Sequence, residues 1–140
     1  MMLAWVHTIA TATDRLGSMG FSPLDGYGGS KHGWWECTWT APRRSGAGYA
    51  AVSLAFDELP GQPGAEQSIE VEIWCGAEAD GRFIRLRFAT LRVQPYELEH
   101  GKMSKVYEPL EHAGQAALEF ADSDLTHTRS GVPMAQHERA

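Results

Sequence analysis

The chain has 140 residues, of which 43% are hydrophobic and 21% are charged, and its formal net charge is −6. These values are typical of one soluble globular domain and exclude a fibrous repeat or a wholly disordered chain. The acidic balance argues against nonspecific binding to nucleic acid or to an anionic membrane, because both require surplus lysine and arginine. A partner attracted by charge is therefore expected to be basic.

The two cysteines, Cys37 and Cys75, are too few for a disulfide framework. Both lie in apolar segments, where a free thiol packs as a small hydrophobic group and fits a reducing compartment. The N-terminal segment MMLAWVHTIATAT is apolar, but it lacks basic residues and His7 interrupts it. No stretch approaches the roughly 20 apolar residues of a membrane span. We therefore expect a cytoplasmic protein that does not associate with membranes.

Apolar residues at steps of three and four predict two amphipathic helices. The first covers residues 2 to 19, with the stripe Met2, Trp5, Ile9, Ala12, Leu16 and Met19. Gly20 is suited to a left-handed C-terminal cap, with Phe21 folding back onto the helix. The second covers about residues 105 to 122, with Leu110, Ala113, Ala117 and Phe120 or Ala121 on one face. After the first helix, the turn formers in SPLDGYGGSKHG (22–33) predict an exposed loop.

Four strands are predicted between the helices, at about residues 33–41, 49–58, 68–75 and 82–93, because apolar and polar residues alternate there. The residues expected on the buried face are Trp35, Cys37, Trp39, Val52, Leu54, Phe56, Ile69, Val71, Ile73, Ile84, Leu86 and Phe88. The order is then helix, four-stranded antiparallel meander, helix. Two helices on one face of the sheet make an α+β two-layer sandwich (αββββα).

The residues GAEADG are predicted to connect the third and fourth strands as a hairpin loop, with Cys75 opposite Arg82. The cross-strand pairs expected on the outward side are Glu72 with Arg85, Glu70 with Arg87 and Trp74 with Phe83. Beyond Phe88 the apolar positions shift to Leu91 and Val93, which indicates a bulge or a bend near Ala89. Residues 1–122 are expected to form one domain, and residues 123–140, which lose periodicity, a disordered tail.

The face of the sheet without helices, called the open face below, is expected to carry aromatic and small side chains in place of long polar ones. Its outward residues include Trp34, Glu36, Tyr49, Ala51, Ser53, Ala55, Trp74 and Phe83. Such a surface is unusual for contact with water alone, so a partner, a second copy or the 22–33 loop is expected to cover it. Glu36, placed opposite Ser53, has no expected cation. The predicted partner-binding residues are Trp34, Glu36, Tyr49, Ser53, Trp74 and Phe83.

No motif for catalysis, cofactor binding or metal binding stands out. In GYGGSK the serine precedes the lysine and a strand follows, unlike a P-loop. For nucleophilic catalysis the only candidate pair is Cys37, as the nucleophile, with His32 as its base. The alternation of side chains buries Cys37, whereas a reactive thiolate needs access to solvent. Glu108, Glu111 and His112 share a helical neighbourhood without a second cluster to complete a metal shell. We therefore expect a protein that is not an enzyme, with no catalytic, cofactor or metal site.

The function expected from these features is a small acidic protein-binding module that holds another protein on the open face. The order of elements over residues 2 to 122 resembles that of bacterial helix-sheet-helix proteins such as the YbjN-like and secretion-chaperone families, and of small immunity or inhibitor proteins. This resemblance implies an inhibitor, immunity or chaperone role, or a homodimer formed through the sheet face. The alternative is a small-molecule binding domain or cofactor-free enzyme with a pocket between sheet and helices.

Overall fold

A computed structural model describes residues 2–24, 28–29, 34–44, 46–59, 68–94 and 104–122. Its helices and strands are α1 (Met2–Gly17), β1 (Ser22–Pro23), β2 (Gly28–Gly29), β3 (Trp34–Pro42), β4 (Tyr49–Leu59), β5 (Ser68–Ala79), β6 (Arg82–Val93) and α3 (Ser104–Asp122). The strands form an antiparallel sheet in the order β1-β3-β4-β5-β6, and β2 also pairs with β3.

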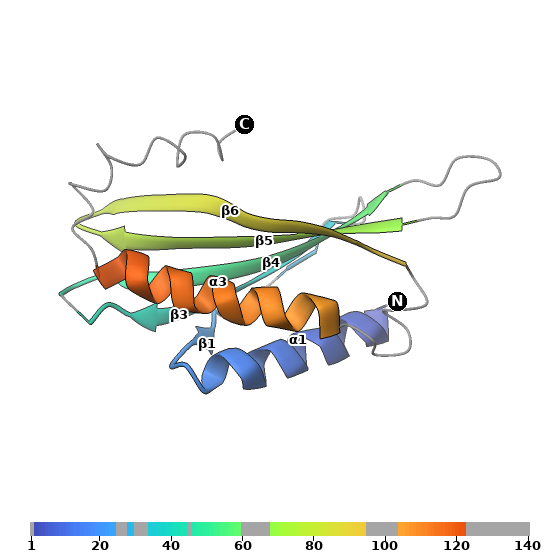
Figure 1. Cartoon of the computed structure of the whole chain (residues 1–140), viewed down its shortest axis with the longest axis horizontal. Coiled ribbons are helices and arrows are strands. Elements are labelled where there is room, and N and C mark those ends of the chain that lie inside the picture. Colours follow the sequence, from blue (N-terminus) through green and yellow to red (C-terminus); the bar gives the residue numbers. More distant parts are fainter. Residues whose placement is uncertain are drawn as a thin grey trace.

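Both helices lie on the same face of the sheet (Figure 1), which we call the helix face. The α3 helix packs mainly on β4 and β5, and α1 lies beside α3 against β1 and β3. The predicted α+β class, with two helices bracketing an antiparallel meander, is confirmed. The 22–33 segment is not all loop, because two short strands within it extend the sheet beyond β3. Pro23 is tolerated there because an edge strand can lack one amide donor.

The first helix ends as the sequence predicts. Gly20 has a positive φ of 96°, a conformation that glycine adopts without a Cβ penalty. The Gly20 amide donates to the Gly17 carbonyl at 3.0 Å and the Phe21 amide to the Leu16 carbonyl at 3.1 Å, the two bonds of a Schellman cap. The Phe21 side chain is buried. This cap turns the chain from α1 toward β1.

The core lies between the helix face and the two helices. Its largest fully buried side chains include Trp39, Leu16, Leu54, Ile69, Ile73 and Leu110. The Trp39 Nε1 donates to the Thr13 hydroxyl at 3.0 Å, and this hydroxyl donates to the Ile9 carbonyl at 2.8 Å. The only polar atom of the indole is therefore satisfied inside the core, as a buried donor requires. Each such large apolar side chain contributes about 1.5–3 kcal/mol through burial.

The predicted register of the β5–β6 hairpin is wrong. Cys75 pairs with Leu86, because the ladder continues through Ala79 to a turn of two residues. The turn residues, Asp80 and Gly81, both have positive φ, 56° and 77°. That geometry belongs to a type I′ turn, for which Asp-Gly is a preferred pair. Four of the six residues read as a loop are thus strand. The pairing moves by four between the turn and Trp74, and by five from Ile73 onward, where the bulge adds one residue to β6.

The predicted bulge is confirmed. Trp74 pairs with Arg87 and Ile73 pairs with Ala89, so Phe88 is the extra residue in β6. A bulge of one residue reverses the alternation. Ile84 and Leu86 before it and Leu91 and Val93 after it consequently share the helix face. Phe88 was predicted to be buried, but it remains 38% exposed.

No helix among the described residues is long and apolar enough to cross a membrane. The predicted disordered tail at 123–140 lies outside the described residues, as do residues 25–27 and 30–33 of the predicted 22–33 loop.

We expect Gly76→Ala to lower the free energy of unfolding by about 1–3 kcal/mol, the usual range for overpacking. A Cβ at Gly76 would collide with the backbone carbonyl of Ile84 on the neighbouring strand. The control is Gly17→Ala, whose Cβ would meet no atom within 4 Å; it should stabilise the helix by up to about 1 kcal/mol. Urea unfolding measures both, and equal effects of the two substitutions would contradict the described β5–β6 packing.

Candidate functional site

The candidate site is the open face of the sheet. Its side chains, as placed by register, are Glu36, Thr38 and Thr40 of β3; Tyr49, Ala51, Ser53 and Ala55 of β4; Glu70, Glu72, Trp74, Gly76 and Glu78 of β5; and Phe83, Arg85, Arg87, Thr90 and Arg92 of β6. The inner strands therefore carry the carboxylates and small residues, and the edge strand β6 carries the guanidinium groups.

Trp74 lies on this face as predicted, but it is not exposed. Only 8% of it is accessible, because two arginines cover the indole. The guanidinium carbons of Arg85 and Arg87 lie 4.1 and 5.0 Å from the ring centroid, within the range of cation–π contact. The indole Nε1 donates to the Glu72 carboxylate at 3.1 Å. Trp74 therefore lies beneath a cluster of charged side chains and does not offer an exposed apolar surface.

Two ion pairs complete this cluster. Arg85 Nη2 lies 3.4 Å from Glu36 Oε2, and Arg87 Nη2 lies 3.9 Å from Glu72 Oε2. The predicted pairs Glu72 with Arg85 and Glu70 with Arg87 are therefore wrong, as is the prediction that Glu36 has no cation. The cause is the shifted β5–β6 register. Each pair is partly exposed, so it contributes about 1 kcal/mol or less.

The Arg85 side chain spans two strands to reach its carboxylate, because Arg85 belongs to β6 and Glu36 to β3. The intervening positions carry small residues, among them Ser53 and Gly76. Larger side chains there would fill the space over which Trp74 and Arg85 extend. Among the described residues, the buried Arg85 Nε finds no hydrogen-bond acceptor, so the stacking contact and the terminal nitrogens hold this side chain in place.

Ser53 is buried within the open face. It is 7% exposed, and its hydroxyl lies 2.8 Å from that of Thr38 in a hydrogen bond within the sheet. The register also pairs Ser53 with Thr38, and Glu36 with Ala55, so the predicted opposition of Glu36 and Ser53 is wrong. The low exposure of Ser53 disfavours it as a contact residue, and that role stays a prediction.

Among the described side chains, the exposed aromatic residues of the open face are Tyr49 and Phe83, at 36% and 49%. Their ring centroids lie 6.2 Å apart with an interplanar angle of 32°, a distance at which aromatic pairs attract. Both residues pair across the sheet with Glu78. The Glu78 carboxylate accepts the Gly81 amide at 3.0 Å, which holds it at the turn beneath the aromatic pair. Phe83 was predicted to face Trp74, and this pairing is wrong.

Trp34 is the remaining predicted contact residue. Trp34 of β3 pairs with Asp57 of β4 in the sheet register. The Trp34 side chain lies outside the described part of the structure. Sequence reasoning missed the arginine cover over Trp74. The arginines of β6 were visible in the sequence, but only the correct register shows that two of them meet one indole.

Cys37 and Glu111 are the candidates for chemistry whose surroundings the structure describes. Cys37 is 1% exposed, as predicted, and burial raises the pKa of its thiol to about 11. His32 lies outside the described residues. Glu111 pairs with Arg15 at 3.3 Å, and no group of three or more metal-ligating side chains occurs within the described ranges. A nucleophilic thiolate needs a lowered pKa and solvent access, and Cys37 has neither.

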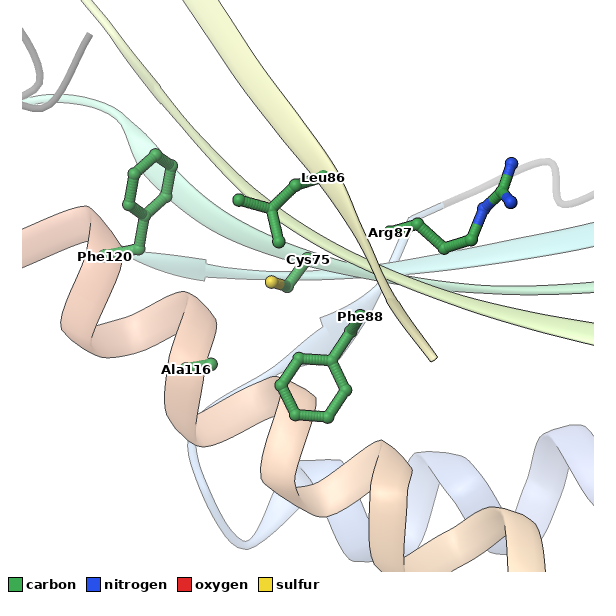
Figure 2. Close-up of a pocket in the computed structure, with 6 residues that line it drawn as sticks. All are labelled: Cys75, Leu86, Arg87, Phe88, Ala116 and Phe120. Carbon is green, nitrogen blue, oxygen red and sulfur yellow. The ribbon is translucent and has the colours of Figure 1, made fainter. Parts of the chain in front are cut away.

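A pocket of about 410 Å³ opens on the helix face, between β6 and α3. Its lining residues are Cys75, Leu86, Arg87, Phe88, Ala116 and Phe120. Figure 2 shows Phe88 and Cys75 on the side of α3, whereas Arg87 extends away from the helix. The pocket is therefore an apolar groove without a converging set of polar groups.

No known protein family, no curated protein and no solved structure matches this chain. The resemblance to helix-sheet-helix families therefore remains one of element order.

We expect Arg85→Ala to lower the free energy of unfolding by about 1–2 kcal/mol, because it uncovers Trp74 and leaves Glu36 without its cation. Arg87→Ala should cost about half as much, since its distances to the ring and to Glu72 are both longer. Chemical unfolding gives both values. Arg85→Met, which keeps apolar cover without charge, separates stacking from ion pairing. A larger loss for Arg87→Ala would contradict the described cluster.

The raised pKa of Cys37 predicts a loss of stability at alkaline pH. The unfolded thiol ionises with a pKa near its ordinary value of 9.0, and the folded thiol near 11. Because the folded state holds its proton longer, the thiol's contribution is complete below about pH 9 and is lost as the pH rises to about 11. The melting temperature should fall more between these values in the parent than in Cys37→Ala. Parallel curves would show that Cys37 is accessible to solvent.

Proposed function

We propose that this chain is a protein-binding module without enzymatic activity, and that it holds another protein on the open face. The observation that carries the proposal is the Tyr49–Phe83 pair, two adjacent exposed aromatic rings on the face that neither helix covers. Aromatic side chains supply much of the energy of protein interfaces, because they remove a large area from water at small entropic cost.

The charged cluster supports this role. Arg85 and Arg87 are held against Trp74, and their carboxylate partners are held in turn by the sheet. Side chains that are already ordered lose little freedom when a partner binds. The guanidinium planes thus present a stiff polar surface beside the aromatic pair. Such a combination of an apolar anchor with ordered charges is the arrangement that gives an interface its specificity.

The partner favoured by the whole-chain charge of −6 is a basic protein, since long-range attraction follows net charge. An inhibitor, immunity or chaperone role suits such a module. The same surface would also serve a homodimer, in which a second copy of the chain binds through the open face. The proposal includes a cytoplasmic location, because Cys37 and Cys75 form no disulfide and reduced cysteines fit a reducing compartment.

The second candidate function is small-molecule binding in the groove between β6 and α3. Its volume of about 410 Å³ suffices for a small ligand. Its lining residues are apolar apart from Cys75 and Arg87, so it offers few groups to orient a substrate. Native mass spectrometry of the purified chain tests this candidate, and a retained metabolite would favour it.

The test of the open-face proposal compares Phe83→Ser with Leu24→Ser. The two side chains are equally exposed, at 49%, but only Phe83 belongs to the aromatic pair. Light scattering measures whether the chain binds a second copy of itself. In affinity capture from a lysate of the source organism, we expect the parent to retain a protein whose captured amount falls about tenfold or more with Phe83→Ser. The loss of one buried aromatic contact readily provides a change of that size.

Leu24→Ser should capture the same protein as the parent. Equal capture by the parent and both variants would place the contact elsewhere and contradict the proposal. Equal loss by both variants would show a general effect of exposed apolar surface. Circular dichroism of each variant confirms that the fold is retained, since neither side chain belongs to the buried core.

A further inference from the structure

The Tyr49–Phe83 pair lies at the start of β4 and of β6, at the end of the sheet that carries the β5–β6 turn (Figure 1). Tyr49, Glu78 and Phe83 are successive partners across β4, β5 and β6. Positions two strands apart are separated by about 9.5 Å, whereas the two ring centroids lie 6.2 Å apart. The rings therefore lean toward each other over the position of Glu78.

Two carboxylates accompany the rings. Glu78 is half-buried, and its Oε1 accepts the Gly81 amide at 3.0 Å. Asp80 is exposed in the turn itself. Within the described ranges no ion pair forms at Glu78 or at Asp80, whereas Glu36 and Glu72 of the open face each have an arginine. The negative charge at this end of the face is therefore left for a cation from outside the chain.

The guanidinium groups of the open face are held away from this end. Arg85 and Arg87 stack on Trp74 and pair with carboxylates of β3 and β5. Trp74 precedes Glu78 by four residues, which is about 13 Å along a strand. Charges in contact with solvent are largely screened beyond about 8–10 Å at physiological ionic strength. The open face is thus electrically balanced over Trp74 and acidic and aromatic at the turn.

A guanidinium group matches both features of the turn end. It is planar and weakly hydrated, so it stacks on aromatic rings, and its N–H groups donate to carboxylates as a fork. The interplanar angle between Tyr49 and Phe83 is 32°, small enough for one flat group to contact both rings. An ammonium group has the same charge but no flat face and a stronger hydration shell. Arginine is therefore favoured over lysine as the contacting residue.

We propose that the Tyr49–Phe83 pair binds an arginine side chain of a basic partner protein. The guanidinium group stacks on the two rings, and its N–H groups donate to the carboxylates of Glu78 and Asp80. This inference rests on the proposed function, because it names the contact by which the open face recognises its partner.

The test is an NMR titration of the full chain, labelled with ¹⁵N, with the blocked peptide acetyl-GRGRG-amide. We expect saturable shifts of the amide signals of Tyr49 and of residues 78–83, with a dissociation constant of about 0.1–1 mM, and weaker binding as salt is added. A peptide with citrulline in place of arginine keeps the shape without the charge and should bind at least tenfold more weakly. A lysine peptide of equal charge should bind about threefold more weakly.

Four variants locate the contact. Phe83→Ser removes one ring, Asp80→Asn removes a charge while keeping a residue that suits the turn, and Glu78→Gln removes a charge while keeping an oxygen that accepts the Gly81 amide. Each should weaken binding of the arginine peptide about threefold or more. Glu119→Gln makes the same change in net charge at an exposed position of α3, on the other layer of the molecule, and should bind as the parent does.

Three outcomes would overturn the inference: equal binding of the arginine peptide and either control peptide, no saturation up to about 10 mM peptide, or equal effects of Asp80→Asn and Glu119→Gln. None of them decides the proposed function, which the capture experiment tests with a natural partner. Capture that is lost with Phe83→Ser, together with any of these outcomes, would mean that the open face binds a protein by another contact.

Discussion

The alternation of side chains along β5 and β6 is the constraint on which the rest of the structure depends. On β5, odd positions such as Ile73 reach the core and even positions such as Trp74 reach the open face. On β6 the Phe88 bulge resets the alternation, so that apolar residues on both sides of it face the helices. Without the bulge, either the leucines or the arginines of β6 would change faces. A single extra residue thus maintains an apolar layer and a charged layer across a strand of 12 residues.

The same constraint explains why the open face can bury a tryptophan without a helix over it. Small residues on β4, such as Ser53, leave space beside Trp74. The long arginine side chains of β6 extend over the indole into that space, and their guanidinium groups form ion pairs with carboxylates of β3 and β5. The apolar stems and flat guanidinium groups cover the ring, while the charges stay partly in water. The face is therefore polar over Trp74 and aromatic at Tyr49 and Phe83, beside the Asp80–Gly81 turn.

The parts of the fold that were predicted correctly all depend on local patterns. The buried positions Ile9, Ala12 and Leu16 of α1, its glycine cap and the apolar face of α3 follow from spacings within a few turns. The side of each strand that faces the helices follows from parity, except at the Phe88 bulge. The register of the hairpin was wrong because GAEADG reads as a loop by composition, whereas only its last two residues turn. Ala77 and Ala79 are fully or almost fully buried, and small residues of this kind give too weak an apolar signal to extend a strand by pattern alone.

The sequence by itself determined the class of fold, the two helices, the four long strands and which side of each strand faces the core, because these depend on periodicity and short-range caps. Only the tertiary structure decided which side chains meet across the strands. The contact between Glu36 and Arg85 joins residues 49 positions apart, and it exists because the register and the small intervening residues bring them together. Whether an outward tryptophan is exposed therefore depended on neighbours in space, and no periodicity along the chain carries that information.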